Sequence, residues 1–256
     1  MRYFVSSVLV LLLLVVAPVA ANAQQSQEGW QFKLGTFFWA NDVKAKLETP
    51  TTTIDKTADF ADLVENAIPS INLTFAAKKD KLAFHTNFFN VHLKMDLESN
   101  NGTRGAQFDQ YIPEAFVGYE VLDTNLTENT KLTLEPYAGV RYYNTRILID
   151  RAGGGELVDV HRSFTDAIFG LIATVGFGEK LSLTLRGDAG GFGWGGESYD
   201  EDYFGLAALN WNYSKNKTLS LGYADLLVKR KNIGRSGDVD AEFEYRGPIF
   251  SHTYQF

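Results

Sequence analysis

The residues best suited to chemistry are an acid and a histidine two positions apart in the segment VDVH. Asp159 and His161 would share one face of an extended strand, about 7 Å apart along it. A carboxylate near an imidazole can activate water, as a surface hydrolase of peptides or lipids requires. Ser163 follows on the same face and offers the hydroxyl that a lipid hydrolase would use. Because Asp-x-His is a common pattern, these residues are catalytic candidates of an alternative function only.

The other residues that could carry chemistry indicate neither a metal site nor a cofactor site. His85 and His92 are seven residues apart, so they would face opposite sides of a strand. His161 and His252 lie far away in the sequence, and no metal-ligand spacing is evident. The chain has no cysteine, which excludes thiol catalysis and thiolate metal ligands. The glycines of GGFGWGG lack the Lys-Ser/Thr of a phosphate-binding loop.

The elements that would position these residues are β-strands, because apolar and polar residues alternate along most of the chain. In LTLEPYAGVRYY, Leu134 and Val140 share one face, while Glu135 and Arg141 share the other. About ten strands are predicted in this way. Their approximate spans are 30–47, 68–78, 81–97, 106–121, 131–149, 157–177, 180–193, 200–213, 218–231 and 240–256. Counts of eight or twelve stay open, because the 43–58 stretch can instead form a hairpin outside a membrane.

The connections between these strands alternate in length. One set is tight and polar, with KKDK, GEK and SKNK and a longer member near 122–130. The other set is longer or rich in glycine, at 48–67, 98–105, 151–156, 193–198 and 232–238. This asymmetry is typical of antiparallel transmembrane β-barrels, which have short periplasmic turns and long extracellular loops. The 30–47 strand should then pair with the 240–256 strand, because an open sheet edge in lipid is costly.

The start of the chain predicts export. Arg2, an apolar run from Val8 to Val16 and the Ala21-Asn22-Ala23 pattern form a signal peptide. Residues 1–23 are expected to be cleaved, and residues 24–256 to form one outer-membrane β-barrel domain. The net charge of −7 argues against a nucleic-acid partner.

If the apolar faces meet lipid, a set of charged residues must point into the barrel. Burying such charges singly is costly, so they are expected in pairs with hydrogen bonds and water. They can form either a selectivity site in a pore or a plug that fills a narrow barrel, and the small number of strands favours the plug. These lumen charges are Lys33, Glu114, Glu135, Arg141, Arg186 and Asp188.

Aromatic residues near strand ends predict a girdle at the membrane interface. Indole and phenol rings favour the headgroup region because each is an apolar body with a polar tip. Phe256, the last residue of the sequence, is expected on the lipid face of the last strand, at the periplasmic rim. The girdle residues are Trp211, Tyr213, Tyr223, Tyr254 and Phe256.

The later half of the chain resembles a family of largely uncharacterised proteobacterial outer-membrane β-barrel proteins. The resemblance rests on YAGVRYY, RGDAGGFGWG, LSLGY and RGPIFSHTYQF, and TADFADLVENA resembles the segment after that family's first strand. The chain departs from the pattern at His252, where the family has an apolar residue, and at Ala224, where it often has arginine. The resemblance implies the outer membrane of a Gram-negative bacterium, with no assigned reaction. It also implies that the terminal aromatic is read by the barrel assembly machinery.

One segment departs from the strand pattern. In ADFADLVENAI, Phe60, Leu63, Val64 and Ala67 recur at helical spacing within the 57–67 stretch. The helix can cap the first long loop, or it can fold inward and constrict a pore.

The function expected from the sequence is non-enzymatic. It is a structural or narrow-channel role for a barrel in outer-membrane lipid, with a charged and largely filled lumen, no cofactor and an unidentified small-solute ligand. The alternatives are a surface hydrolase that uses Asp159 and His161 and a soluble, lipocalin-like ligand-binding barrel.

Overall fold

The structure is built from strands. The computed structural model describes residues 29–48, 53–58, 72–97, 104–150, 156–192, 200–231 and 240–256. No helix within these ranges is long and apolar enough to span a membrane. The described strands are β1 (Gln31–Trp39), β2 (Asp42–Glu48), β3 (Thr53–Ala58), β4 (Asn72–Lys79), β5 (Leu82–Leu97), β6 (Arg104–Tyr119), β7 (Leu122–Thr127), β8 (Thr130–Asp150), β9 (Glu156–Phe177), β10 (Leu181–Gly191), β11 (Glu201–Ser214), β12 (Lys217–Arg230) and β13 (Asp240–Gln255).

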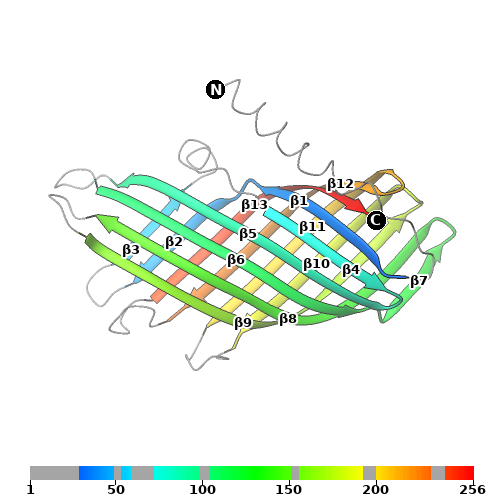
Figure 1. Cartoon of the computed structure of the whole chain (residues 1–256), viewed down its shortest axis with the longest axis horizontal. Coiled ribbons are helices and arrows are strands. Elements are labelled where there is room, and N and C mark those ends of the chain that lie inside the picture. The colour runs from blue at the N-terminus through cyan, green and yellow to red at the C-terminus, as the bar shows by residue number, and fades with distance from the viewer. Residues whose placement is uncertain are drawn as a thin grey trace, which may run out of the picture.

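Ten of these strands close into an antiparallel barrel (Figure 1). Their order is β1-β4-β5-β6-β8-β9-β10-β11-β12-β13, and β13 pairs back with β1. At this seam Lys33 lies opposite Gln255 and Trp39 lies opposite Ile249. The predicted all-β barrel of about ten strands is confirmed, as is the pairing between its first and last strands.

The two ends of the barrel differ in their connections. One end, called here the turn end, carries the tight turns at 80–81, 128–129, 178–180 and 215–216. The opposite end, called here the loop end, carries the longer connections, and most residues of those connections lie outside the described ranges. The last residue lies at the turn end, where the backbones of Phe256 and Phe32 exchange two hydrogen bonds of 2.9 and 3.1 Å.

The prediction of one continuous strand over 30–47 is wrong. The strand ends at Trp39, and after Ala40 and Asn41 the chain continues as β2. Pro248 of β13 accepts a hydrogen bond from the Ala40 N–H at 2.9 Å but has no N–H to return, so the ladder is interrupted there. Gly247 allows the backbone at Ala40 to pass close to β13, because a Cβ at position 247 would lie 2.2 Å from the Ala40 carbonyl oxygen.

Two hairpins extend the ring of ten strands. β2 pairs with the loop-end half of β13 on one side and with β3 on the other. The alternative of a hairpin within 43–58 is therefore confirmed. Residues 122–130 also form more than the predicted turn, because β7 pairs with the start of β8. Of the predicted 57–67 helix, Thr57 and Ala58 belong to β3, and residues 59–67 lie outside the described ranges.

The wall of the barrel has an apolar outer face. Residues opposite each other in neighbouring strands share a face, so the register assigns each position to one side of the sheet. Large apolar side chains are exposed all round the outer face. They include Phe84, Val117, Val140, Phe169, Leu171, Leu185, Leu209, Trp211, Leu221 and Phe250.

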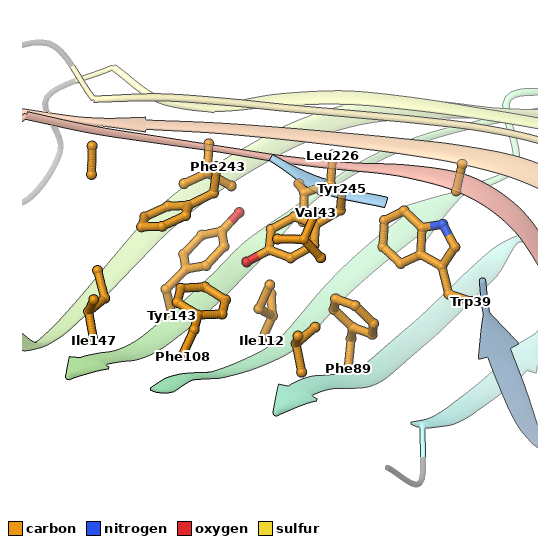
Figure 2. Packing of buried hydrophobic residues seen from close by; sticks show 14 of the residues in the cluster. Trp39, Val43, Phe89, Phe108, Ile112, Tyr143, Ile147, Leu226, Phe243 and Tyr245 are labelled. Atoms are coloured by element: carbon orange, nitrogen blue, oxygen red, sulfur yellow. The ribbon is translucent and has the colours of Figure 1, made fainter. Parts of the chain in front are cut away.

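Part of the inner face is filled by a packed apolar cluster (Figure 2). Phe243 and Tyr245 of β13 and Leu226 of β12 meet Phe89 and Phe108 from the facing wall. The ring centroids of Phe108 and Phe243 are 5.3 Å apart, and those of Phe89 and Tyr245 are 5.8 Å apart. Trp39 closes the cluster beside the β1–β2 break and donates its Nε1–H to the Gly247 carbonyl oxygen at 3.2 Å. Two facing walls therefore touch through their side chains.

Candidate functional site

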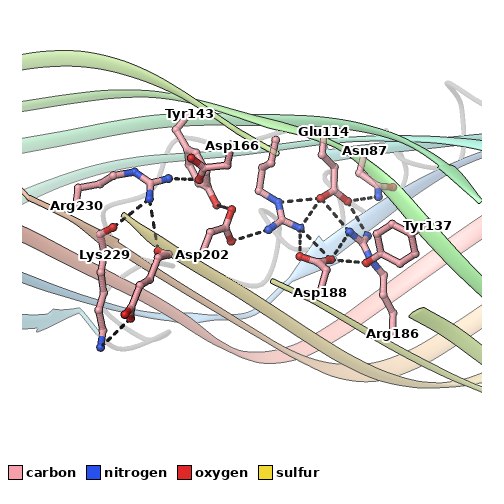
Figure 3. A network of polar contacts seen from close by, with 12 residues as sticks. Asn87, Glu114, Tyr137, Tyr143, Asp166, Arg186, Asp188, Asp202, Lys229 and Arg230 are labelled. Carbon is pink, nitrogen blue, oxygen red and sulfur yellow. Dashed lines mark hydrogen bonds and ion pairs between the residues drawn. The ribbon is translucent and has the colours of Figure 1, made fainter. Parts of the chain in front are cut away.

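Beside the apolar cluster, charged side chains from several strands meet inside the barrel (Figure 3). We call this group the lumen network; it consists of Glu114, Tyr137, Arg141, Tyr143, Asp166, Arg186, Asp188, Asp202 and Arg230. The strand register puts these residues on the inner face; for example, Glu114 of β6 lies directly opposite Arg141 of β8. Four of the six lumen charges expected from the sequence belong to it.

Two arginines join the acids in the middle of the lumen network. Arg141 donates from Nε and Nη2 to Glu114 Oε2 at 2.9 and 2.7 Å, and from Nη2 to Asp188 Oδ1 at 2.9 Å. Arg186 donates from Nη1 to Glu114 Oε1 at 2.6 Å and from Nη2 to Asp188 Oδ2 at 2.9 Å. Each carboxylate therefore contacts both guanidinium groups. Such forked, charge-assisted contacts are the strong class of hydrogen bond.

Polar neutral groups complete this centre. The Tyr137 hydroxyl donates to Asp188 and accepts from Arg186 Nε at 2.8 Å. Asn87 of β5 donates to Glu114 Oε1 at 2.6 Å. Burying charges costs several kcal/mol per ion unless partners replace the lost water. These contacts provide such partners.

A second group of contacts continues the lumen network across β8, β9, β11 and β12. Asp202 accepts from Arg141 Nη1 and from the Tyr143 hydroxyl, both at 2.7 Å. Arg230 pairs with Asp166 and donates from Nη1 to the Lys229 carbonyl oxygen at 3.0 Å. Arg230 Nε lies 4.0 Å from Asp200, a residue just before β11. Burial raises the pKa of the Asp200 carboxyl, and the nearby Arg230 opposes this rise.

Each guanidinium group of the lumen network lies against at least one aromatic ring. The Cζ atom of Arg186 lies 4.5 Å from the Phe116 ring centroid and 4.6 Å from that of Phe204. Arg230 lies 5.0 Å from the ring of Tyr143. A planar guanidinium group can stack in this way and still donate in its plane. The rings also exclude water, since exposure in the network ranges from 0% for Asp202 to 9% for Glu114.

The other two predicted lumen charges lie nearer the turn end. Glu135 contacts His85 Nε2 at 2.8 Å, and Gly118 makes room for it, since a Cβ there would lie 2.2 Å from Glu135 Oε1. Lys33 lies on the inner face of β1, opposite Ala76 and Gln255. A further pair, Lys78 and Glu120 at 2.6 Å, also lies near this end.

A cavity of about 130 Å³ occupies the inner face of β10 to β13 on the turn-end side of Arg186. Small side chains leave this space open, and they come from four neighbouring strands. Its lining residues are Thr184, Leu206, Ala208, Asn210, Ser220, Gly222, Ile249 and Ser251.

The predicted catalytic residues lie elsewhere. His161 lies on the outer face of β9 and is exposed, and its Nε2 contacts Asn144 Oδ1 at 3.2 Å. Ser163 accepts a 3.3 Å hydrogen bond from the same Asn144 side chain. Asp159 belongs to β9, but its side chain lies outside the part of the structure that is described. No metal-binding group of three or more His, Cys, Asp or Glu side chains occurs among the described residues.

The predicted girdle residues lie on the outer face. Trp211 and Tyr213 adjoin the 215–216 turn, while Tyr223 lies further along the wall, opposite Ala207 and Pro248. At the rim, Phe256 stacks on Phe32 and on Tyr254, with centroids 5.8 and 6.1 Å apart. His252 also faces outward, and its Nε2 contacts the Tyr213 hydroxyl at 2.8 Å. This contact satisfies a polar ring on an otherwise apolar face.

The sequence analysis did not assign Asp166, Asp202 and Arg230 to the lumen. Asp202 belongs to the acidic run YDED beside a long connection, and Arg230 belongs to the basic strand end LLVKRKN. Asp166 shares its face with Phe164 and Ile168, so alternation gives no clear inside or outside there. The register of the β8–β9 pair is the feature that assigns Asp166 to the inner face, because Asp166 lies directly opposite Arg141.

Comparisons with known proteins find similar barrels but no assigned family. No family model matches the chain, and no curated protein matches it. Among solved structures, the outer membrane protease OmpT from Escherichia coli is 8% identical in sequence and has a TM-score of 0.46. The match covers 92% of this chain and 99% of the OmpT chain. The attachment invasion locus protein Ail of Yersinia pestis is 12% identical, with coverages of 90% and 100% and a TM-score of 0.36. Neisserial surface protein A is 14% identical with the same coverages and a TM-score of 0.36. Likenesses at this level assign neither a ligand nor an activity.

Proposed function

We propose that this chain is an outer-membrane β-barrel with a closed lumen, which serves a structural role and not that of an open pore or an enzyme; a narrow channel is the alternative that conductance of the folded protein would favour. The observation that carries the proposal is the lumen network, in which three buried guanidinium groups bind four buried carboxyl groups across the barrel. Together with the apolar cluster, the network fills the space through which a solute would pass.

The membrane location is supported by the outer face of the wall. Exposed Phe, Leu, Val and Trp side chains surround the barrel, while the buried charged side chains lie on the inner face. A soluble, lipocalin-like barrel would present the opposite pattern, with its polar side chains facing water. Lipid and the barrel assembly machinery are the partners that we propose, the latter reading the strand that ends at Phe256. The resemblance to the uncharacterised proteobacterial family and the cleavage of residues 1–23 remain part of this proposal.

The closed lumen predicts that the protein does not conduct ions across a membrane. Purified, heat-modifiable protein in a planar lipid bilayer should show no single-channel steps. A variant that removes one cation and one anion of the lumen network, Arg186→Ala with Glu114→Ala, keeps the charge balance but empties the centre. This variant should conduct small ions, because water would replace the two side chains.

A matched control separates opening of the lumen from general damage. Arg246 and Asp225 form an exposed ion pair at 2.7 Å, and Arg246→Ala with Asp225→Ala should leave the bilayer silent. Steady conductance steps from the folded wild-type protein would contradict the closed lumen.

The hydrolase alternative is carried by the His161–Asn144–Ser163 contacts on the outer face. It predicts that His161→Ala abolishes turnover of peptide or lipid substrates while the barrel keeps its heat-modifiable mobility. Turnover that is unchanged in this variant would remove His161 from consideration.

A further inference from the structure

The cavity between β10 and β13, called here the turn-end cavity, lies between a polar row and a row of mostly small side chains. Both rows cross the four strands, because their members lie opposite one another in the register. The row nearer the turn end consists of Ser182, Asn210, Ser220 and Ser251. The row behind it consists of Thr184, Ala208, Gly222 and Ile249. Ala208 and Gly222 project little into the lumen, and the cavity occupies the space above them.

The polar row offers hydrogen-bonding groups to the contents of the turn-end cavity. Asn210 donates from Nδ2 to Ser182 Oγ at 3.1 Å and to Thr184 Oγ1 at 2.9 Å, so both amide hydrogens are used. The Asn210 carbonyl oxygen has no hydrogen-bond partner among the described residues, and neither do the hydroxyl groups of Ser220 and Ser251. Two hydroxyl groups and one carbonyl oxygen therefore remain for a ligand that both donates and accepts hydrogen bonds.

The lining of the turn-end cavity fits a neutral ligand. The described residues that line it carry no formal charge, and Leu206 and Ile249 make part of it apolar. Arg186 lies opposite Leu206, but its guanidinium group is engaged by Glu114 and Asp188. A charged ligand would lose water without gaining a counter-charge. A ligand with hydroxyl groups on one side and C–H groups on the other, as in a sugar, matches both parts of the lining.

The turn-end cavity has the size of a small sugar and is open to water. At about 10–15 Å³ for each water-sized group, its volume of about 130 Å³ has room for roughly ten such groups. This is the size of a monosaccharide or a sugar alcohol. Water reaches the lumen from the turn end, because Lys33 is exposed although it lies on the inner face. Thr218 and Thr253, between the cavity and the turn end, are only partly buried.

We propose that the turn-end cavity binds a small neutral polyhydroxyl compound, a monosaccharide or a sugar alcohol, which enters from the turn end. The hydroxyl groups of Ser220 and Ser251 and the carbonyl oxygen of Asn210 bind the hydroxyl groups of this compound. Leu206 and Ile249 contact its C–H groups. The site lies outside the lumen network, so the proposal goes beyond the closed lumen and holds whether or not the barrel conducts.

Saturation-transfer NMR on the folded wild-type protein measures this binding, with glucose and xylitol as the probes. The protein is held in a detergent with zwitterionic headgroups, because sugar-based detergents would compete for the site. At least one of the two probes should bind saturably. Gluconate, which is charged, and cyclohexanol, which has a single hydroxyl group, are the comparison compounds. Each should bind about tenfold more weakly than the better probe, because polar groups of the ligand or of the site then lack partners.

Two variants test the location of the site. Ala208→Leu fills the turn-end cavity and should abolish binding of the probes. Ser251→Ala removes one hydroxyl group and should weaken binding about 2–10-fold, as expected for the loss of one hydrogen bond. Ser214→Ala is the matched control, because it removes an exposed hydroxyl group beside the 215–216 turn, and it should bind as the wild type does. Heat-modifiable mobility shows whether each variant folds, and Ser251→Ala decides the test should Ala208→Leu fail to fold.

The proposal is overturned if neither glucose nor xylitol binds to the wild type, since the cavity would then hold water only. It is also overturned if Ser251→Ala or folded Ala208→Leu binds the probes as tightly as the wild type does. Equal binding of the probes, gluconate and cyclohexanol would overturn it as well, because the site would then not select a neutral polyhydroxyl compound. None of these measurements uses conductance, so failure of this proposal is distinguishable from failure of the closed lumen.

Discussion

At the residue scale, the lumen network depends on arginine chemistry more than on positive charge. Arg186 donates to Glu114, Asp188 and Tyr137 while it lies between the rings of Phe116 and Phe204. A lysine ammonium group has three donors around one point and no plane to stack. It can satisfy only part of this set, and carboxylate oxygens would remain buried without partners.

We therefore expect Arg186→Lys to destabilise the barrel even though it keeps the charge. Loss of forked contacts to buried carboxylates should cost about 1–3 kcal/mol, measured as the free energy of unfolding in lipid vesicles. Lys78→Arg is the matched control, because the pair of Lys78 with Glu120 lies near the turn end and Lys78 is partly exposed. Equal stability of Arg186→Lys and wild type would show that the fork geometry is unimportant.

At the element scale, the unusual feature is the break between β1 and β2. The chain changes partners there: β1 pairs with β4 and β13, whereas β2 pairs with β13 and β3. Trp39 fills the space at the break, and Gly247 lets the two backbones approach. The break thus moves the β2–β3 hairpin out of the ring of ten strands while Trp39 remains in the apolar cluster.

Gly247→Ala should disturb this passage. The added Cβ would lie 2.2 Å from the Ala40 carbonyl oxygen, so the backbone must shift, at a cost of about 1–3 kcal/mol. Gly205→Ala is the control, because a Cβ there meets no heavy atom within 4 Å. Both variants are compared by their thermal transitions in gel mobility. If the two variants show the same thermal transition, the close approach at Gly247 does not affect the stability of the barrel.

At the scale of the whole molecule, closure depends on the ends of the described chain. Phe256 and Phe32 exchange backbone hydrogen bonds, and their rings stack 5.8 Å apart. This contact joins the last strand to the first at the turn end. Since an open barrel would leave the backbone groups of its two edge strands unpaired, the contact also completes the wall.

Phe256→Ala should lower the fraction of protein that assembles. The variant loses the ring contacts with Phe32 and Tyr254 but keeps the backbone ladder. The measurement compares boiled and unboiled samples from the outer-membrane fraction by gel mobility, where a folded barrel migrates differently. Gln255→Ala, which loses only a 3.4 Å hydrogen bond to Gln31, serves as the control. Normal assembly of Phe256→Ala would show that the terminal ring is dispensable.

The sequence by itself determined most of the strands, the barrel and part of the inner face. A period of two is a local property, because successive side chains in a strand point to opposite sides. Alternation in LTLEPYAGVRYY therefore places Arg141 inward without knowledge of its partners. The unequal connections and the need to close a sheet edge then predict the barrel and its β1–β13 seam.

Only the tertiary structure decided how the inner face is used. Alternation assigns Arg141, Asp188 and Asp202 to a side of the sheet, but their contacts join strands that are not neighbours in the wall. Such contacts depend on barrel diameter, on strand register and on the break at Ala40–Asn41. The excess of buried carboxyl groups over guanidinium groups in the lumen network is likewise a property of several strands, because it arises only where their side chains share one dry space.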